Sequence, residues 1–377
     1  MFDKTKKIIA CAAAVLLFSL HVYSQVLNKD MPAKGEWDFQ MSKIWEIEET
    51  GGNIFANIGT ILSDDNETVY VSDRKSFKVY IIDKNGTFIS AFGKRGEGPG
   101  ELKQMERFFL VDGQLAFPDR NAGRVLYFST KGEFVNSVLM PTNLSPRAMI
   151  DKNNLFSVPY INWRDPKGKA QGFIYNLEDK SKKVIFEFST YQKGVVRKTS
   201  GKSRSSYSYS NSDITPVMVT ACDQNKIYYG MSNVYSITVK DLKEDSTLVF
   251  SLERKKKRVP PGFKDEVLQG IDFPGNIKDE IKKGFPDFLT YFNTIFSDSE
   301  QNIYVVVTDP VHQNERKLDI FSPAGVYMYR SEISVEEGME IAGSHINKDK
   351  LYLALETEDG DIKLAKYTIH PVGRIPF

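Results

Sequence analysis

One short pattern of strands and turns recurs along this chain of 377 residues. In each copy, two apolar strands are separated by a polar turn, and a second turn of the form Asp/Ser-x-x-Gly leads to a third strand. The clearest copies begin at Val69, Leu115 and Ile303, and Gly86 and Gly132 in the first two are 46 residues apart. A repeat of about 40–50 residues is typical of a four-stranded propeller blade. Because one such unit cannot bury its own apolar faces, the copies must pack side by side around an axis.

Three weaker copies, at 154–188, 226–250 and 351–367, bring the predicted number of blades to six. The last copy has no outer strand of its own, whereas the strand-like segment 43–48 precedes the first copy and has no blade of its own. We therefore predict an all-β fold in which residues 25–377 form a single six-bladed β-propeller with four-stranded blades. The N-terminal strand would complete the last blade and so close the ring, which leaves no blade with an unpaired outer edge.

The first 24 residues have the pattern of a signal peptide. Lys4, Lys6 and Lys7 are followed by an apolar run from residue 8 to 22. This run is shorter than the ~20 residues of a membrane span, so cleavage near Ser24 is favoured over a retained anchor. We predict an exported protein, periplasmic or extracellular, with no transmembrane span in the mature chain.

Charge and cysteine content exclude other classes. The chain has 50 basic and 49 acidic residues, which argues against nucleic acid as a partner. Without the signal peptide only Cys222 remains, in an apolar strand, so no internal disulfide can form and we expect a buried, unreactive thiol.

The longer connections are predicted to share one face of the propeller. Strands within a blade are antiparallel, so second-to-third-strand turns and blade-to-blade connections lie on the same side. This side carries the glycine-rich segment 92–102, the Ser/Tyr-rich segment 199–213 and an insertion at 253–291 with a helical stretch at 277–284. Long loops on a rigid scaffold usually carry the binding residues, so this loop-rich face is the predicted functional face.

The segment Phe92-Gly-Lys-Arg-Gly-Glu-Gly-Pro-Gly-Glu-Leu102 follows a blade that ends in Asp83-x-x-Gly86. In this respect the chain resembles secreted bacterial six-bladed propellers, similar to the NHL-repeat and TolB-like proteins. The resemblance implies the fold and export. It implies no particular activity, because most members of that branch are assigned by fold.

Polar turns after the second strands supply the candidate ligand-binding residues. Carboxylates and arginines that converge on the channel mouth could bind a sugar, a peptide carboxylate or a metal. The alternative is that each Asp caps its own turn and each Arg pairs locally. In the glycine-rich segment, Arg95 could help bind an anion, or the segment could be a structural crossover. The full candidate set is Asp73, Arg74, Arg95, Asp119, Arg120, Trp163, Arg164, Asp309 and His312.

No complete catalytic motif is present in the sequence. A nucleophile elbow, a phosphate-binding loop and a dinucleotide fingerprint are all missing. His312, His345 and His370 have no short spacing that would favour zinc, although a Ca²⁺ or Mg²⁺ site built from Asp and Glu oxygens is left open. Our leading hypothesis is a non-catalytic propeller, without a cofactor, that binds a protein, peptide or glycan. The alternative is a divalent-metal-dependent hydrolase or lyase with its site at the channel mouth. The basic run 254–258 could bind an acidic polymer or phospholipid headgroups, or could be a solvated loop. Aromatic platforms for a sugar or peptide, or side chains that pack under the loops, are the two interpretations of Tyr160, Trp163, Tyr207 and Tyr209.

Overall fold

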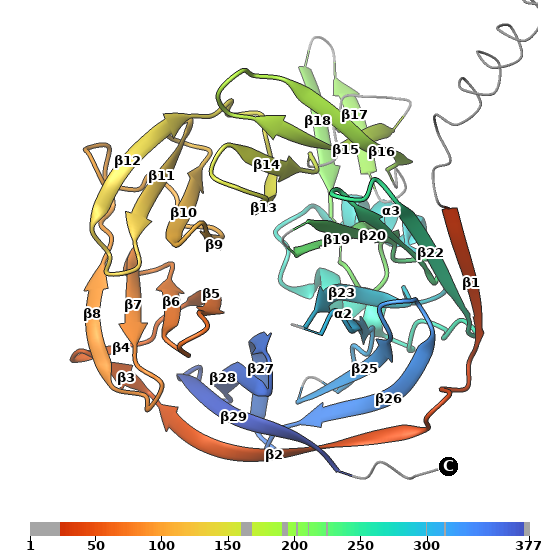
Figure 1. Ribbon diagram of the computed structural model, residues 1–377. Helices are drawn as coiled ribbons and strands as arrows, with labels where there is room; N and C mark the ends of the chain where they lie inside the picture. Colours follow the sequence, from red (N-terminus) through yellow and green to blue (C-terminus); the bar gives the residue numbers. More distant parts are fainter. Residues whose placement is uncertain are drawn as a thin grey trace, which may run out of the picture.

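Six four-stranded blades surround a central axis in the computed structural model, as Figure 1 shows. The structure describes residues 23–159, 168–190, 195–200, 203–209, 211–223, 225–298, 300–312 and 314–372. Within each blade the strands follow one another from the innermost to the outermost position and pair antiparallel. The predicted all-β, six-bladed fold is confirmed.

The first three blades are continuous in the sequence. Blade 1 consists of β5 (Ile58–Ser63), β6 (Val69–Asp73), β7 (Lys78–Ile82) and β8 (Phe88–Phe92). Blade 2 consists of β9 (Phe109–Val111), β10 (Gln114–Asp119), β11 (Arg124–Ser129) and β12 (Phe134–Leu139). Blade 3 consists of β13 (Pro146–Met149), β14 (Asn154–Ser157), β15 (Lys169–Asn176) and β16 (Lys182–Ser189).

The last three blades come from the C-terminal half of the chain, and the N-terminal strand β2 completes blade 6. Blade 4 consists of β19 (Met218–Asp223), β20 (Lys226–Met231), β21 (Ser236–Asp241) and β22 (Thr247–Glu253). Blade 5 consists of β23 (Phe292–Ser297), β24 (Ile303–Val307), β25 (Glu315–Phe321) and β26 (Tyr327–Ser334). Blade 6 consists of β27 (Met339–Asn347), β28 (Lys350–Thr357), β29 (Ile362–Val372) and β2 (Glu36–Ile47).

The N-terminal strand β2 closes the ring, as predicted from segment 43–48. It pairs antiparallel with β29 from Asp38 opposite Val372 to Ile47 opposite Leu364, and its first residues pair parallel with β26 of blade 5. A short hairpin, β3 (Glu49–Thr50) and β4 (Asn53–Ile54), leads on to blade 1. The sequence pattern missed β1 (Tyr23–Lys29), which adds a parallel fifth strand to the edge of blade 4. The predicted cleavage near Ser24 would fall among the first residues of β1.

The glycine of the Asp/Ser-x-x-Gly turn is a contact point between consecutive blades. Gly132 has φ +86°, and a Cβ there would lie 2.5 Å from the ring of Phe92 on the outer strand of blade 1. Gly325 faces Phe250 of blade 4 in the same way, and Gly86 faces Trp45 of the closing strand. The repeated glycine is therefore needed for its backbone conformation and for the aromatic ring that packs on it.

The apolar core lies between the blades and not within them. In the described residues each of the six blade pairs shares one buried cluster, for example Tyr70, Leu115 and Phe128 between blades 1 and 2. Alternate strand residues point to the two faces of a blade, so one strand contributes to two neighbouring clusters. Each blade is thus stabilised chiefly by its neighbours.

Two insertions pack together on the loop-rich side. The hairpin β17 (Val195–Ser200) and β18 (Ser203–Ser208) precedes blade 4, and helices α2 (Phe263–Gln269) and α3 (Gly275–Gly284) precede blade 5. The helix expected at 277–284 is present, whereas α2 was not expected. Tyr207 contacts Phe273 edge to face at 5.6 Å between ring centroids, and Tyr209 contacts Phe285 at 6.4 Å. These tyrosines therefore pack between hairpin and helices. No helix in the described part of the chain is long and apolar enough to cross a membrane.

Candidate functional site

Two adjoining cavities lie at the mouth of the central channel on the loop-rich face. The first, which we call the cationic pocket, has a volume of about 410 Å³ and lies over blades 1–3; Met105, Phe109, Pro118 and Pro146 complete its wall. The second, the channel cavity, has a volume of about 770 Å³ and lies over blades 4–6. The polar residues of the cationic pocket are Arg74, Gln104, Glu106, Arg107, Ser145 and Arg147. Arg107 lines both cavities, so they form one composite site.

The cationic pocket combines side chains from three separate segments. Arg74 comes from the turn after β6, Arg107 from the connection between blades 1 and 2, and Arg147 from the innermost strand of blade 3. Its one carboxylate, Glu106, lies 4.0 Å from the guanidinium of Arg120 and accepts a hydrogen bond from Gln104. The pocket therefore has an excess of guanidinium groups, which bind carboxylates and phosphates through paired N–H donors.

β-Bulges occur on three of the innermost strands, at residues that line the mouth. The register of β13 skips Arg147, that of β23 skips Asn293, and that of β27 skips Ala342. All three residues line one of the two cavities. A bulge residue is left out of the ladder and redirected, which is why bulges often occur beside functional sites.

Asp73 and Asp119, two of the predicted ligand-binding residues, are fully buried and accept hydrogen bonds from the backbone. Asp73 accepts from the N–H groups of Ala56 at 2.8 Å and Lys75 at 2.9 Å. Asp119 accepts from those of Lys103 at 2.5 Å and Ala122 at 2.9 Å. Each carboxylate ties the chain that enters a blade to the turn after its second strand. These contacts are those of the turn-capping alternative.

The same buried position recurs in other blades with smaller side chains. The hydroxyl of Ser157 accepts from the N–H of Ser145 at 3.0 Å, and the hydroxyl of Ser232 accepts from that of Val217 at 3.0 Å. In blade 5 the Thr308 and Thr290 hydroxyls are 2.9 Å apart. The position is thus a structural link repeated around the ring. In blades 1 and 2 it holds in place the turns that carry Arg74 and Arg120.

Asp309 and His312 are brought together at the channel cavity. The Asp309 carboxylate lies 2.8 Å from Lys317 Nζ and 3.3 Å from His312 Nδ1. Burial acts to raise the pKa of Asp309, but the hydrogen bond and charge of Lys317 outweigh it and hold the pKa below its usual value. Asp309 is therefore ionised at neutral pH, next to a lysine. Trp163 and Arg164 lie outside the described residues.

Arg95 lies on the glycine-rich segment and lines neither cavity; its guanidinium is 5.3 Å from the centre of the Phe77 ring. In this segment Glu101 accepts a hydrogen bond from the N–H of Gly98 at 3.0 Å, and Arg124 donates to the carbonyl oxygens of Gly98 and Glu101, each at 3.1 Å. The segment is thus held by its own carboxylate and a neighbouring arginine, as expected of a structural crossover.

Two half-buried charged residues that no sequence pattern marked, Asp213 and Arg316, also line the channel cavity. Burial raises the pKa of Asp213, against the hydrogen bond of Asn293 and the charge of Arg316. Arg316 donates to the carbonyl oxygens of Glu315 at 2.8 Å and Ile341 at 2.5 Å. Asp213 comes from a blade connection, where no strand pattern marks a residue as inward-facing. Perturbed groups in a cleft are candidates for a functional site.

Within the described ranges no group of three or more His, Cys, Asp or Glu side chains is arranged to hold a metal ion. His345 and Cys222 line a smaller cavity of about 260 Å³, which shares Thr294, Phe296, Ser344 and Ile346 with the channel cavity. His345 Nε2 accepts a hydrogen bond from the N–H of Ser63 at 3.1 Å, which engages this nitrogen. Burial raises the pKa of the Cys222 thiol to about 12, so it is unreactive at neutral pH.

His345 gives a prediction for the pH dependence of stability. Burial lowers its pKa to about 4, while the unfolded chain has an ordinary value near 6.5. Between these values the unfolded state binds the extra proton, so stability decreases as the pH falls. From pH 7.5 to 5 this amounts to about 2 kcal/mol, which His345→Gln should remove. Urea unfolding at both pH values measures it, and an equal pH dependence in the variant and the parent would contradict this assignment.

The basic run 254–258 begins with a residue that holds the fold together. Arg254 forms an ion pair with Asp319, which is fully buried on β25, and another with Asp30 at 2.7 Å. It thereby joins the segment after β1 to blades 4 and 5. Arg254 is consequently engaged within the protein and is not available to an acidic polymer.

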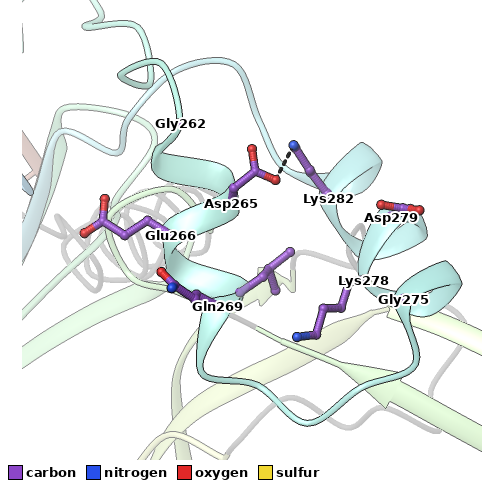
Figure 2. A pocket seen from close by; sticks show the side chains of 9 residues that line it. Gly262, Asp265, Glu266, Gln269, Gly275, Lys278, Asp279 and Lys282 are labelled. Carbon is purple, nitrogen blue, oxygen red and sulfur yellow. Dashed lines mark hydrogen bonds and ion pairs between the residues drawn. The ribbon is translucent and has the colours of Figure 1, made fainter.

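A further cavity of about 530 Å³ lies between α2 and α3. Figure 2 shows Asp265 and Lys282 pointing toward each other across it as an ion pair, while Glu266 points away from α3. The opposite charges of this pair are satisfied by one another, and Leu268 covers the floor as part of the cluster beneath the helices. We regard this cavity as a feature of helix packing and assign the candidate site to the channel mouth.

Comparison with known proteins agrees with the fold. A member of the DUF4221 family from Bacteroides vulgatus has a TM-score of 0.57 at 9% identity and covers 89% of this chain and 99% of its own. A presumed exported protein of Bacteroides fragilis has a TM-score of 0.52 at 14% identity and covers 93% of this chain and 100% of its own. At such identities these two structures inform on fold alone. No curated protein matches the chain.

A family model described as a 6-bladed beta-propeller, DUF5128, matches residues 39–228. The match runs from the closing strand through blades 1, 2 and 3 into blade 4, and covers half of the chain. It includes Arg74, Arg107 and Arg147, the arginines of the cationic pocket. This chain belongs to the DUF5128 family of six-bladed β-propellers.

Proposed function

We propose that this protein is an exported, non-catalytic binding protein that takes an acidic ligand at the channel mouth. One observation carries the proposal: Arg74, Arg107 and Arg147 surround a single pocket of about 410 Å³ with Glu106 as its one carboxylate. The ligand would be a protein segment, a peptide or a glycan that presents a carboxylate or a similar anion.

The geometry favours an anion for electrostatic reasons. Glu106 is already engaged by Arg120 and Gln104, so it offsets little of the charge of the three lining arginines. Two unit charges 4 Å apart attract by about 4 kcal/mol near a protein surface, against about 1 kcal/mol in bulk water. A concave site over blades 1–3 thus strengthens the attraction that an isolated surface arginine would provide.

Removal of the two exposed arginines, Arg74 and Arg107, tests the proposal. The probes are oligogalacturonate, tetraglutamate and a neutral oligosaccharide of equal length, titrated calorimetrically at low salt. A hydrogen bond to a charged group contributes about 1.5–3 kcal/mol, so the double variant Arg74→Ala/Arg107→Ala should bind an acidic probe at least 100-fold more weakly. Because both side chains are exposed, the melting temperature should hardly change.

Arg95→Ala is the matched control for this experiment. Arg95 is also exposed on a connection between blades 1 and 2, but it lines neither cavity. The Arg95→Ala variant should bind the acidic probe as tightly as the parent does. For both proteins the affinity for the acidic probe should fall as the salt concentration is raised, because the interaction is between charges. Equal binding by the parent and the double variant, or tighter binding of the neutral probe, would contradict the proposal.

Metal removal distinguishes this proposal from a metal-dependent hydrolase or lyase. We expect EDTA, and then added Ca²⁺ or Mg²⁺, to leave the melting temperature unchanged. A site occupied at about 100 times its dissociation constant would instead contribute roughly 2.7 kcal/mol to the folded state. A stoichiometric metal that is lost on Asp309→Ala would support the enzyme and overturn the proposal.

A further inference from the structure

The two halves of the channel mouth carry opposite charge. On the side of blades 1–3, the pocket is lined by Arg74, Arg107 and Arg147 and by the single carboxylate of Glu106, which lies 4.0 Å from Arg120. On the side of blades 4–6, the channel cavity is lined by Asp213, Glu266, Asp309 and Glu315, against Arg316 and the adjacent Lys317. Arg107 lies at the junction.

From this separation we infer that the ligand is a short peptide with free ends, its terminal carboxylate in the cationic pocket and its terminal ammonium in the channel cavity. The inference rests on the proposed function and names the class of ligand. Opposite charges at the two ends of a binding surface orient a ligand that carries a charge at each end. They disfavour the same ligand bound in the reverse direction and ligands charged at one end only.

The surface between the charged ends suits a peptide backbone. β23 and β27 are the innermost strands of blades 5 and 6, so each has one edge that no neighbouring strand of the described chain occupies. Thr294, Ala342 and Ser344 on these strands are exposed and line the cavity. Their side chains are small, which allows another backbone to come close. An extended peptide can pair with an open strand edge, where main-chain hydrogen bonds give affinity.

Neutral polar groups in the cavity complement the same backbone. Asn293 sits at the bulge of β23, and Asn211 and Ser212 come from the connection before blade 4. Their amide and hydroxyl groups can donate to peptide carbonyl oxygens and accept from peptide N–H groups. A uniformly acidic glycan would place like charges against Asp213 and Asp309, which is unfavourable.

The inference is tested with a tetrapeptide library of random sequence in four forms: free, N-acetylated, C-amidated and blocked at both ends. Peptides retained by the full mature protein are counted by mass spectrometry. We expect free peptides to be enriched at least tenfold over each blocked form. The best free sequence is then titrated in all four forms against the parent and three variants.

Two of the variants should each lose the discrimination of one end of the peptide. The Asp213→Asn variant should bind the N-acetylated peptide within twofold of the free peptide. The Arg107→Ala variant should bind the C-amidated peptide within twofold of the free peptide. Glu300→Gln, an exposed carboxylate in the turn between β23 and β24, lines neither cavity and should behave like the parent.

The outcomes separate the inference from the proposed function. If amidation weakens binding but acetylation does not, or if oligogalacturonate binds and no free peptide does, the peptide is excluded while an acidic ligand stands. If neither the peptides nor the acidic probes bind, both are overturned.

Discussion

A chain that begins at residue 51 is expected to lose its single cooperative unfolding transition, or to melt at least about 10 °C lower, because it lacks the strand that closes the ring. β2 supplies nine registered pairs with β29. Trp45 and Ile47 pack on the cluster between blades 6 and 1, and Trp45 Nε1 donates to the carbonyl oxygen of Lys84 at 3.0 Å. Without β2, the edge of β29 is open to pairing with other chains. Differential scanning calorimetry and light scattering measure both effects.

The control is a chain that begins at Asp30, which lacks β1 only. The partner of β1, β22, is already paired within blade 4, so this chain should keep its cooperative transition. It also retains Asp30, which pairs with Arg254. If the chain from residue 51 melts like the chain from Asp30, the role given to β2 is wrong.

Gly132→Ala is expected to lower the free energy of unfolding by about 2–5 kcal/mol. The backbone at φ +86° costs an alanine about 1–2 kcal/mol. In addition, its Cβ would lie 2.5 Å from the Phe92 ring, which is itself packed against Phe117 and Phe128 and has little room to move. Overpacking of this kind costs typically 1–3 kcal/mol. Urea denaturation measures the loss.

Gly360→Ala is a matched control for the backbone contribution. Gly360 has φ +85° in a turn with the same 2.9 Å backbone hydrogen bond, but nothing lies within 4 Å of its would-be Cβ. Gly360→Ala should therefore lower the free energy of unfolding only by the cost of the backbone conformation, about 1–2 kcal/mol. In a Phe92→Ala background, Gly132→Ala should cost no more than Gly360→Ala. Equal losses for the two glycines in the parent would exclude the contact with Phe92 as a cause.

The fold was accessible from the sequence because a propeller blade is a local unit. Strand alternation at segments such as 69–73 and 79–82, with a turn glycine at a fixed offset, repeats often enough to be counted. The closing strand at 43–48 followed from the same count, because the sixth copy was one strand short. In contrast, β1 and α2 are single elements that repeat nowhere and take their places from contacts with blade 4 and the hairpin at 195–208.

The site was accessible only in part. Arg74 and Asp309 were predicted as site residues because each follows the second strand of a blade. Arg120 was predicted for the same reason, and it lies 4.0 Å from Glu106 of the cationic pocket. Arg107 and Asp213 belong to connections without periodic pattern, and Arg147 and Asn293 face the mouth because of bulges that depend on the pairing of whole strands. Local sequence could not indicate either arrangement.

By itself, the sequence determined the number of blades, the strand that closes the ring and the face that carries the long loops, because all three depend on the order and spacing of local elements. Only the tertiary structure decided which charges meet. Asp73 and Asp119, conspicuous in the repeat, are used to hold the backbone, whereas Arg107 and Arg147, which no repeat marks, lie together with Arg74. The physical reason is that a propeller site is assembled from separate blades, whose residues become neighbours only when the ring has closed.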